Sequence, residues 1–132
     1  MKKILFVCIE NSNRSQMAQA FARIHGQGIV EAYSAGSKPS GKINPKAIEA
    51  MKEIGYDLTT HQSKSLDKIP QVEYEYVVSM GCGENCPFVQ AKNRIEWNIP
   101  EPKNMDRDEL RKVRRLIEQH VKELIEKIKT LK

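Results

Sequence analysis

Cysteine, aromatic residues and long apolar runs are all scarce in this chain of 132 residues. It has only three cysteines, and so small and odd a number argues against a disulfide scaffold and for catalytic, redox or metal use. Aromatic residues make up 6% of the sequence and are not interleaved with the cations of the basic C-terminal segment, so we expect no nucleic-acid partner. No apolar run reaches the length of about 18 residues that a membrane-spanning helix needs, so we expect no membrane association.

The size and charge of the chain limit its class further. A length of 132 residues suits one ordinary core and is too short for two, so we expect a single domain covering residues 1–132. The net charge of +5 favours anionic substrates. An apolar run follows Met1-Lys2-Lys3, but it is too short for a secretory signal, and polar residues come directly after it. We expect a cytoplasmic protein, and we expect a monomer.

The segment from Cys8 to Arg14 separates a thiol from a guanidinium by five residues. Residues 3–8, before it, have the pattern of a strand, and the apolar periodicity after it predicts a helix. The N–H groups of a loop between strand and helix point into one concavity, where tetrahedral oxyanions bind. Arg14 adds a planar fork of donors for two oxygens. The residues expected to hold an oxyanion are Cys8, Ile9, Glu10, Asn11, Ser12, Asn13, Arg14 and Ser15.

Cys8 lies at the mouth of this positive site, where the thiolate form is stabilised and becomes the resting nucleophile. A free cysteine at the end of a strand is alternatively a small buried hydrophobic residue. The combination with Arg14 and Ser15 at the start of a helix favours the catalytic interpretation. The sequence therefore predicts nucleophilic attack on a tetrahedral oxyanion.

Strand and helix patterns alternate along the chain, with no internal repeat, linker or low-complexity tract. We expect strands at residues 3–8, 29–34, 74–80 and 94–98. Helices are expected at 15–25, at 45–54, briefly at 66–69, and from about residue 107 to the C-terminus. This alternation predicts an α/β fold, a single-domain open parallel sheet of about four strands with helices on both faces.

The other two cysteines, Cys82 and Cys86, follow the third expected strand. Ligands bind outside the carboxyl ends of the strands in an open parallel sheet, so Cys8 and Cys82 are expected at the same edge. Two cysteines at this spacing resemble half a zinc site, but no second ligand pair lies at a suitable spacing. Gly81, Gly83 and a proline after Cys86 favour an irregular segment that can change shape. A redox role is the better interpretation.

Together these residues resemble an arsenate reductase of the low-molecular-weight tyrosine phosphatase fold, the type regenerated by thioredoxin. The resemblance spans essentially the whole chain. It rests on residues 8–18, Tyr33-Ser34-Ala35-Gly36, residues 44–51, the Cys82/Cys86 segment, and Trp97 shortly before Glu101-Pro102. The phosphatase-type loop does not separate a reductase from a phosphatase, whereas the additional cysteine pair does.

The resemblance implies a relay of three thiols. Cys8 attacks arsenate, and Cys82 then attacks Cys8 of the adduct, so that arsenite leaves and a Cys8–Cys82 disulfide forms. Cys86 next attacks Cys82 and gives a Cys82–Cys86 disulfide. An external thiol reductant opens this bond, and no bound cofactor is expected. Thioredoxin is the expected partner. Glutaredoxin and mycothiol systems are the alternatives, because the two redox cysteines are closer together than in the familiar thioredoxin-coupled members.

The resemblance also assigns roles around the nucleophile. Ser15 is expected to stabilise the Cys8 thiolate, and Glu101, directly before a proline, takes the place of the family's usual general-acid Asp. A solvated loop carboxylate is the alternative for Glu101. Some members bind potassium through carboxylates near the loop. The matching positions here are Gln19 and Lys64, and Lys64 can supply the positive charge, so no metal requirement is expected.

Three other functions agree with parts of the pattern. A low-molecular-weight protein tyrosine phosphatase would cleave aryl phosphate esters through a Cys8 phosphocysteine, but no aromatic pair follows Glu101-Pro102 to line a phosphotyrosine slot. A phosphocarrier of the sugar-transport type also has a cysteine after its first strand, but it needs neither Arg14 nor the cysteine pair. A redox-sensing or zinc-binding module is the non-catalytic alternative.

Overall fold

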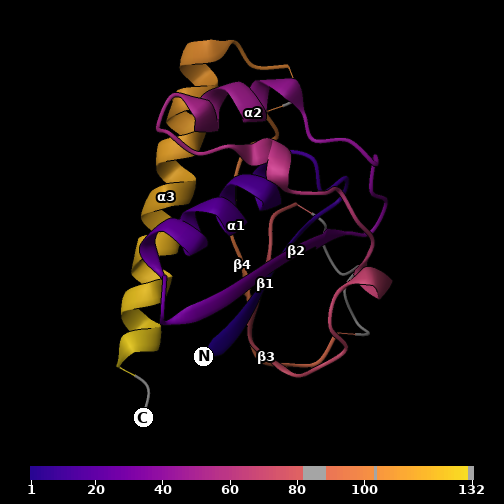
Figure 1. Ribbon diagram of the computed structural model, residues 1–132, viewed down its shortest axis with the longest axis vertical. Helices are drawn as coiled ribbons and strands as arrows, with labels where there is room; N and C mark the ends of the chain where they lie inside the picture. Colours follow the sequence, from indigo (N-terminus) through magenta and orange to yellow (C-terminus); the bar gives the residue numbers. More distant parts are fainter. Residues whose placement is uncertain (82–88, 103, 131–132) are drawn as a thin grey trace.

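The computed structural model describes residues 1–81, 89–102 and 104–130. Its centre is a parallel sheet with the strand order β2-β1-β3-β4 (Figure 1). The strands are β1 (Lys2–Cys8), β2 (Val30–Gly36), β3 (Tyr74–Ser79) and β4 (Ala91–Glu96). The four-stranded parallel sheet predicted from the sequence is confirmed.

The fourth strand differs most from expectation, because it begins at Ala91 instead of residue 94. It lies at the edge of the sheet, paired only with β3, and its side chains are exposed or half-buried. A polar edge strand has neither an apolar run nor a clean alternation. Its start therefore leaves no clear signal in the sequence.

The helices follow the expected pattern closely. They are α1 (Arg14–His25), α2 (Pro45–Lys52) and α3 (Arg107–Lys129), with short 3-10 helices η1 (Leu58–Thr60) and η2 (Leu66–Lys68). The Asn44 side chain caps α2 by accepting from the Lys46 N–H, and α2 ends at residue 52 instead of 54. Asp106 and Glu109 form a capping box at the start of α3. No described helix is both long and apolar enough to cross a membrane.

The two faces of the sheet are covered differently. Ile4, Phe6 and Val78 belong to the larger apolar cluster, which also contains the buried side chains of all three α-helices. Leu5 and Val77 belong to a smaller cluster on the opposite face, which is covered by η2 and irregular chain around residues 69–74 and 89. Both faces are covered, and the three α-helices gather on one of them (Figure 1).

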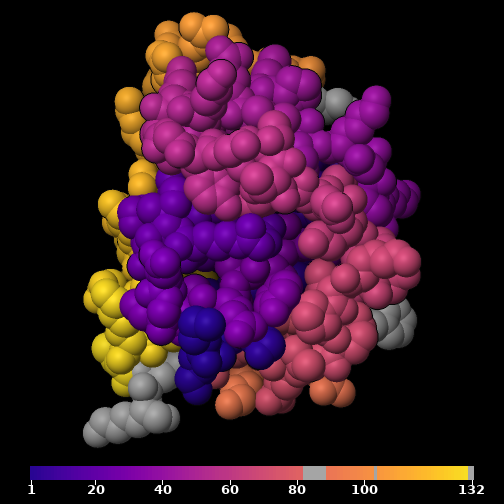
Figure 2. Space-filling model, in the orientation of Figure 1, coloured from indigo at the N-terminus to yellow at the C-terminus, as the bar shows by residue number. Residues whose placement is uncertain are grey.

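Helix α3 lies along one side of the molecule, beside α1 and α2 (Figure 2). It packs through an apolar stripe along one face, whose buried residues are Leu110, Val113, Ile117, Val121, Leu124, Ile125 and Ile128. This stripe joins the core that all three α-helices share. Helix α3 thereby packs against both α1 and α2.

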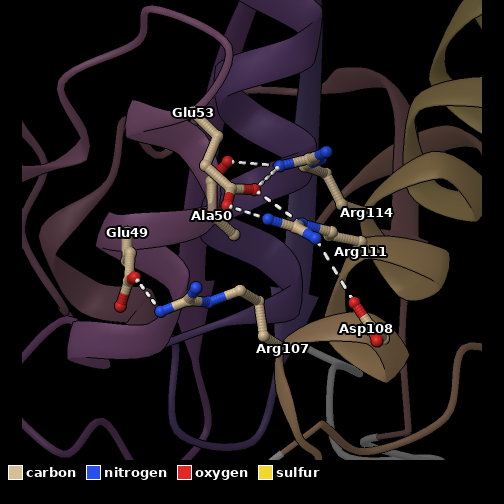
Figure 3. A network of polar contacts seen from close by, with 7 residues as sticks. All are labelled: Glu49, Ala50, Glu53, Arg107, Asp108, Arg111 and Arg114. Atoms are coloured by element: carbon tan, nitrogen blue, oxygen red, sulfur yellow. Dashed lines mark hydrogen bonds and ion pairs between the residues drawn. The ribbon is translucent and has the colours of Figure 1, made fainter.

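Charged side chains connect α2 to α3 at the surface (Figure 3). Glu53 pairs with Arg111 and with Arg114, each at 2.7 Å, and Glu49 pairs with Arg107 at 2.9 Å. Two arginines pull the pKa of Glu53 down from 4.5 to about 2 through their hydrogen bonds, so this carboxylate is ionised at neutral pH.

The carboxyl ends of β1, β2 and β3 meet at one edge of the sheet. Cys8 stands opposite Gly36 in the register, and the Met80 N–H donates to the Val7 carbonyl at 2.8 Å. A side chain does not fit at Gly36, because a Cβ there would lie 2.5 Å from the Ile9 carbonyl oxygen. The loop after β1 therefore passes directly over the end of β2.

Candidate active site

The loop after β1 is held by hydrogen bonds to its outward-facing carbonyl groups. The carbonyls of Ile9, Glu10, Asn11, Ser12 and Asn13 accept, in that order, from Lys38 N–H (2.8 Å), Ser40 N–H (3.0 Å), the Gln16 amide (2.9 Å), Asn44 N–H (2.8 Å) and Met17 N–H (3.0 Å). In a trans peptide the N–H group points opposite to the C=O group, and the chain has no cis peptide among its described residues. The N–H groups of residues 10–14 are therefore directed to the inner side of the loop.

Asn11 is the residue that gives the loop its curvature. It is fully buried, and its φ of 50° makes it the one non-glycine residue in the described chain with a positive φ. Asparagine tolerates this left-handed conformation better than most residues. The Lys64 N–H donates to Asn11 Oδ1 at 2.9 Å, so a segment far away in the sequence holds the Asn11 side chain in place.

A short chain of hydrogen bonds ends at the Cys8 thiol. Asn11 Nδ2 donates to Ser15 Oγ at 2.8 Å, and Ser15 Oγ lies 2.8 Å from Cys8 Sγ. Because Asn11 donates to the Ser15 oxygen, the Ser15 hydroxyl hydrogen is free to point at the sulfur. All three residues are buried, and Cys8 is 3% exposed. The Ser15 hydroxyl is therefore placed to donate a hydrogen bond to the sulfur of the candidate nucleophile.

Arg14 is held beside the loop by two groups from the segment after β4. Its Nη1 donates to the Ile99 carbonyl at 3.0 Å, and its Nη2 pairs with Glu101 Oε2 at 2.8 Å. Arg14 is buried, whereas the Glu101 side chain is 53% exposed. The guanidinium thus already contacts one carboxylate oxygen, which is the kind of group that an oxyanion substrate would present to it.

Gly81 brings the end of β3 against the same arginine. A Cβ built on Gly81 would lie 2.6 Å from Arg14 Nη1, and φ is 81° at this residue, so a side chain there meets both a steric and a conformational obstacle. The chain leaving β3 therefore passes next to the guanidinium. Cys82 follows directly in the sequence, and it lies outside the described residues, as does Cys86.

A cavity of about 260 Å³ opens beside the loop. Glu10, Ser12, Lys42, Asn44 and Glu101 are among the residues that line it. Glu10 therefore contributes its carbonyl to the support of the loop and lies on the wall of this opening. Ile9, at 38% exposure, is the apolar side chain of the loop that reaches solvent.

The structure thus brings predicted catalytic residues together in two pairs at this loop: Cys8 with Ser15, and Arg14 with Glu101. Sequence reasoning missed the supporting residues, above all Gln16, His61 and the 38–44 segment whose N–H groups fix the loop. The Gly36 position gave an indirect signal, since a glycine at the end of a strand marks a place where another backbone approaches.

The residues at the potassium positions of the resemblance do not fit a cation site. The Gln19 Oε1 atom accepts a hydrogen bond from Ser34 at 2.6 Å, and Gln19 Nε2 donates to the Ala32 carbonyl. Lys64 brings a positive charge in place of a carboxylate.

A thiol at the end of a parallel strand, followed by a loop of inward N–H groups and an arginine at the start of the next helix, defines the class of proteins that use a cysteine nucleophile on tetrahedral oxyanions. The sequence as a whole agrees with that class. The chain belongs to the low molecular weight phosphotyrosine protein phosphatase family, whose pattern matches residues 3–132.

Several proteins similar to this chain are arsenate reductases. The chain is 36% identical over 131 residues to the glutaredoxin arsenate reductase of a Synechocystis species, covering 97% of this chain and 99% of the relative. A solved structure of an arsenate reductase in the phosphate binding state matches with a TM-score of 0.88 at 36% identity, covering 97% and 99% of the two chains. A thioredoxin-dependent arsenate reductase from Corynebacterium glutamicum matches with a TM-score of 0.79 at 29% identity, covering 98% of this chain and 62% of that one.

Proposed function

We propose that this chain reduces arsenate to arsenite, beginning with attack by the Cys8 thiolate on arsenic. The loop N–H groups and Arg14 hold the arsenate oxygens and offset their negative charge. An arsenic–sulfur bond forms, and one arsenate hydroxyl leaves as water after taking up a proton. Arsenic remains As(V) in this step, because thiolate has only replaced hydroxide.

The reduction occurs when a second thiolate attacks the Cys8 sulfur. We propose Cys82 for this role: a Cys8–Cys82 disulfide forms, the arsenic–sulfur bond breaks, and its electron pair stays on arsenic, which leaves as arsenite. Cys86 then attacks Cys82 and releases Cys8 as a thiolate. An external dithiol supplies the two electrons that reopen the Cys82–Cys86 bond.

The observation that carries this proposal is the meeting of two segments at one sheet edge. Cys8 lies within a loop built for an oxyanion, and Gly81, the residue before Cys82, lies against Arg14 of that loop. Sequential attack by thiolates requires the attacking sulfur to reach the first one. The approach of Gly81 supports such a path from Cys82 to Cys8.

Thioredoxin is the reductant we propose. A solved relative is described as thioredoxin-dependent, which supports a protein dithiol. Another similar protein is named for glutaredoxin, so the two systems are the natural pair to compare. Arsenate-dependent oxidation of NADPH, measured with thioredoxin and its reductase and then with glutaredoxin and mycothiol systems, separates them.

We propose that Glu101 acts as the general acid for the leaving hydroxyl or alkoxide. Its carboxyl group reaches Arg14 Nη2 at 2.8 Å, which supports a position beside the reacting oxyanion. Glu101→Gln should lower the rate of phosphate-ester cleavage by about 10²–10⁴-fold if the proton comes from this group. A rate within a few-fold of wild type would assign the proton to another group or to water.

The experiment that tests the relay compares Cys82→Ser with Cys86→Ser. Both should end multiple-turnover arsenate reduction. The Cys86 variant should consume one arsenate and accumulate a Cys8–Cys82 disulfide, visible by peptide mass spectrometry, whereas the Cys82 variant should form neither native disulfide. Normal turnover by the Cys86 variant would reduce the relay to two thiols.

A weak phosphatase activity is the second candidate, because the loop itself needs no further thiol to cleave a phosphate ester. Hydrolysis of the Cys8 phosphocysteine ends with attack by water, so Cys82→Ser and Cys86→Ser should leave cleavage of small aryl phosphates largely unchanged. If both variants also reduced arsenate normally, phosphatase activity would be the better assignment.

A further inference from the structure

Beneath the loop lies a group of buried polar side chains that the proposed chemistry does not use. Gln16 of α1 is fully buried, and His61, just after η1, is 8% exposed. They come from segments 45 residues apart, and His61 Nδ1 lies 2.9 Å from Gln16 Oε1. Because these side chains are shielded from water, each of their hydrogen-bond donors and acceptors needs a partner within the protein.

The hydrogen bonds of the Gln16 amide fix its orientation. Gln16 Nε2 donates to the Asn11 carbonyl and to the Gln62 carbonyl, each at 2.9 Å, so both of its hydrogens are used. Gln16 Oε1 is then left to accept from His61 Nδ1. The proton of the His61 ring therefore lies on Nδ1.

The far side of the His61 ring receives two donors. Tyr56 OH lies 2.6 Å from His61 Nε2, and Arg23 Nη1 lies 3.2 Å from the same atom. Burial, assisted by the positive charges of Arg23 and Lys64, lowers the pKa of His61 from 6.5 to about 4, so the ring is neutral at physiological pH. A neutral ring with Nδ1–H donates to Gln16 Oε1 and leaves Nε2 to accept, with Tyr56 OH as the nearer donor.

The Gln16 amide connects His61 to a single peptide group of the loop, the one between Asn11 and Ser12. Gln16 Nε2 pulls the Asn11 carbonyl outward, and the opposite end of that peptide is the Ser12 N–H, which is thereby turned inward. Asn11 adopts the left-handed conformation at this point. A residue in that conformation needs the surrounding contacts to hold it.

We propose that His61 is a positioning residue for the oxyanion loop, acting through the Gln16 amide to keep the Ser12 N–H directed at the bound oxyanion. Without the His61 donor, the Gln16 amide can rotate, and the Asn11–Ser12 peptide loses the bond that sets its direction. This inference rests on the proposed function of the loop, and it adds a residue that touches neither substrate nor nucleophile.

The test measures oxyanion binding directly. In a Cys82→Ser/Cys86→Ser background Cys8 is the sole thiol, and inorganic phosphate is titrated as a protector of Cys8 against alkylation by iodoacetamide. His61→Phe and Gln16→Met should each weaken protection by about tenfold, the usual effect of losing one well-aimed hydrogen bond to an anion. His61→Asn keeps a donor near the Nδ1 position and should stay within about threefold of the parent.

A matched control and a double variant separate positioning from general destabilisation. His25→Asn changes a histidine at the opposite end of α1, where it pairs with Glu118 at 2.7 Å, and should leave phosphate protection unchanged. The His61→Phe/Gln16→Met double variant should be no weaker than either single variant, because both act on the same peptide.

Three outcomes would overturn the inference. If His61→Phe lowers the melting temperature but protects Cys8 within about twofold of the parent, His61 is merely structural. If the effects of His61 and Gln16 add fully, His61 does not act through Gln16. If His61→Phe does not fold, His61→Asn and Gln16→Met decide alone, and equal, unchanged protection in both overturns it. A parent protein that phosphate does not protect would refute the proposed loop function itself.

Discussion

Two polar networks in this molecule are built on opposite principles. Between α2 and α3, full charges meet at the surface: Glu53, at 26% side-chain exposure, pairs with Arg111 and Arg114. Beneath the oxyanion loop, Gln16 and His61 meet as neutral, buried groups. The first network joins two helices, and the second holds one loop.

The difference follows from what each environment allows. Exposed ion pairs are solvated and screened, so they tolerate imperfect geometry and contribute modestly. A buried charge without a matching partner is costly, so a buried network is stable only if every donor finds an acceptor. The neutral network therefore has a single arrangement, and that is what a loop with inward N–H groups requires. The candidate active-site loop is therefore supported by the network whose hydrogen bonds allow only one arrangement.

The largest loss of activity is expected from substitution of the nucleophile, Cys8. Cys8→Ser should abolish arsenate reduction and aryl phosphate cleavage together, since a serine hydroxyl is not ionised at neutral pH and both reactions need the thiolate. Steady-state assays with each substrate measure this. Substantial activity of either kind would break the link between the buried network and the chemistry.

Arg14→Lys should come next, with a loss of about 10²–10³-fold in kcat/KM for either substrate. An ammonium group cannot bind two oxyanion oxygens through a planar fork or reproduce the paired contacts to Ile99 and Glu101. The measurement is the same pair of assays, with circular dichroism to confirm folding. Near-normal kinetics would make Arg14 a structural ion-pair partner, like the arginines of α3.

A pH titration of stability should separate the two networks. The folded-state pKa of His61 is lowered to about 4, so between pH 6.5 and about pH 4 the unfolded chain binds a proton there that the folded chain does not. Stability is therefore present above pH 6.5 and falls as the pH drops to about 4, by on the order of 3 kcal/mol from this residue. Chemical denaturation of wild type and His61→Asn across this range measures the difference.

The same titration gives a different window for the surface network. The pKa of Glu53 is lowered from 4.5 to about 2, so its contribution is present above pH 4.5 and is lost between pH 4.5 and about pH 2. The free energy of unfolding could instead depend on pH equally in wild type and His61→Asn between pH 6.5 and 4. That result would show that His61 has an ordinary pKa, and the contrast between the networks would disappear.

The sequence could predict the parts of the site that lie close together in the chain. Cys8, Arg14 and Ser15 belong to one strand–loop–helix unit whose local pattern is strong, and α3 follows from its apolar stripe. Asn44, which also holds the loop, belongs to the recognised 44–51 segment. The other residues that hold the loop come from residues 38–40 and 61–64, which have no pattern of their own. His61 could not be found because a lone histidine looks alike whether it is exposed or buried, and only the fold places it against Gln16.

The smallest effect is expected at the surface network. Glu53→Gln removes the charge that pairs with Arg111 and Arg114, while Arg114 keeps its bond to the Ala50 carbonyl at 2.6 Å. The melting temperature should fall by about 4 °C or less at low salt, and the difference should shrink in 1 M NaCl because salt screens exposed pairs. Arsenate reduction should be unchanged, since the loop does not depend on these ions. A large decrease that salt does not diminish would mean that this pair behaves as a buried one, and that exposure alone does not distinguish the two networks.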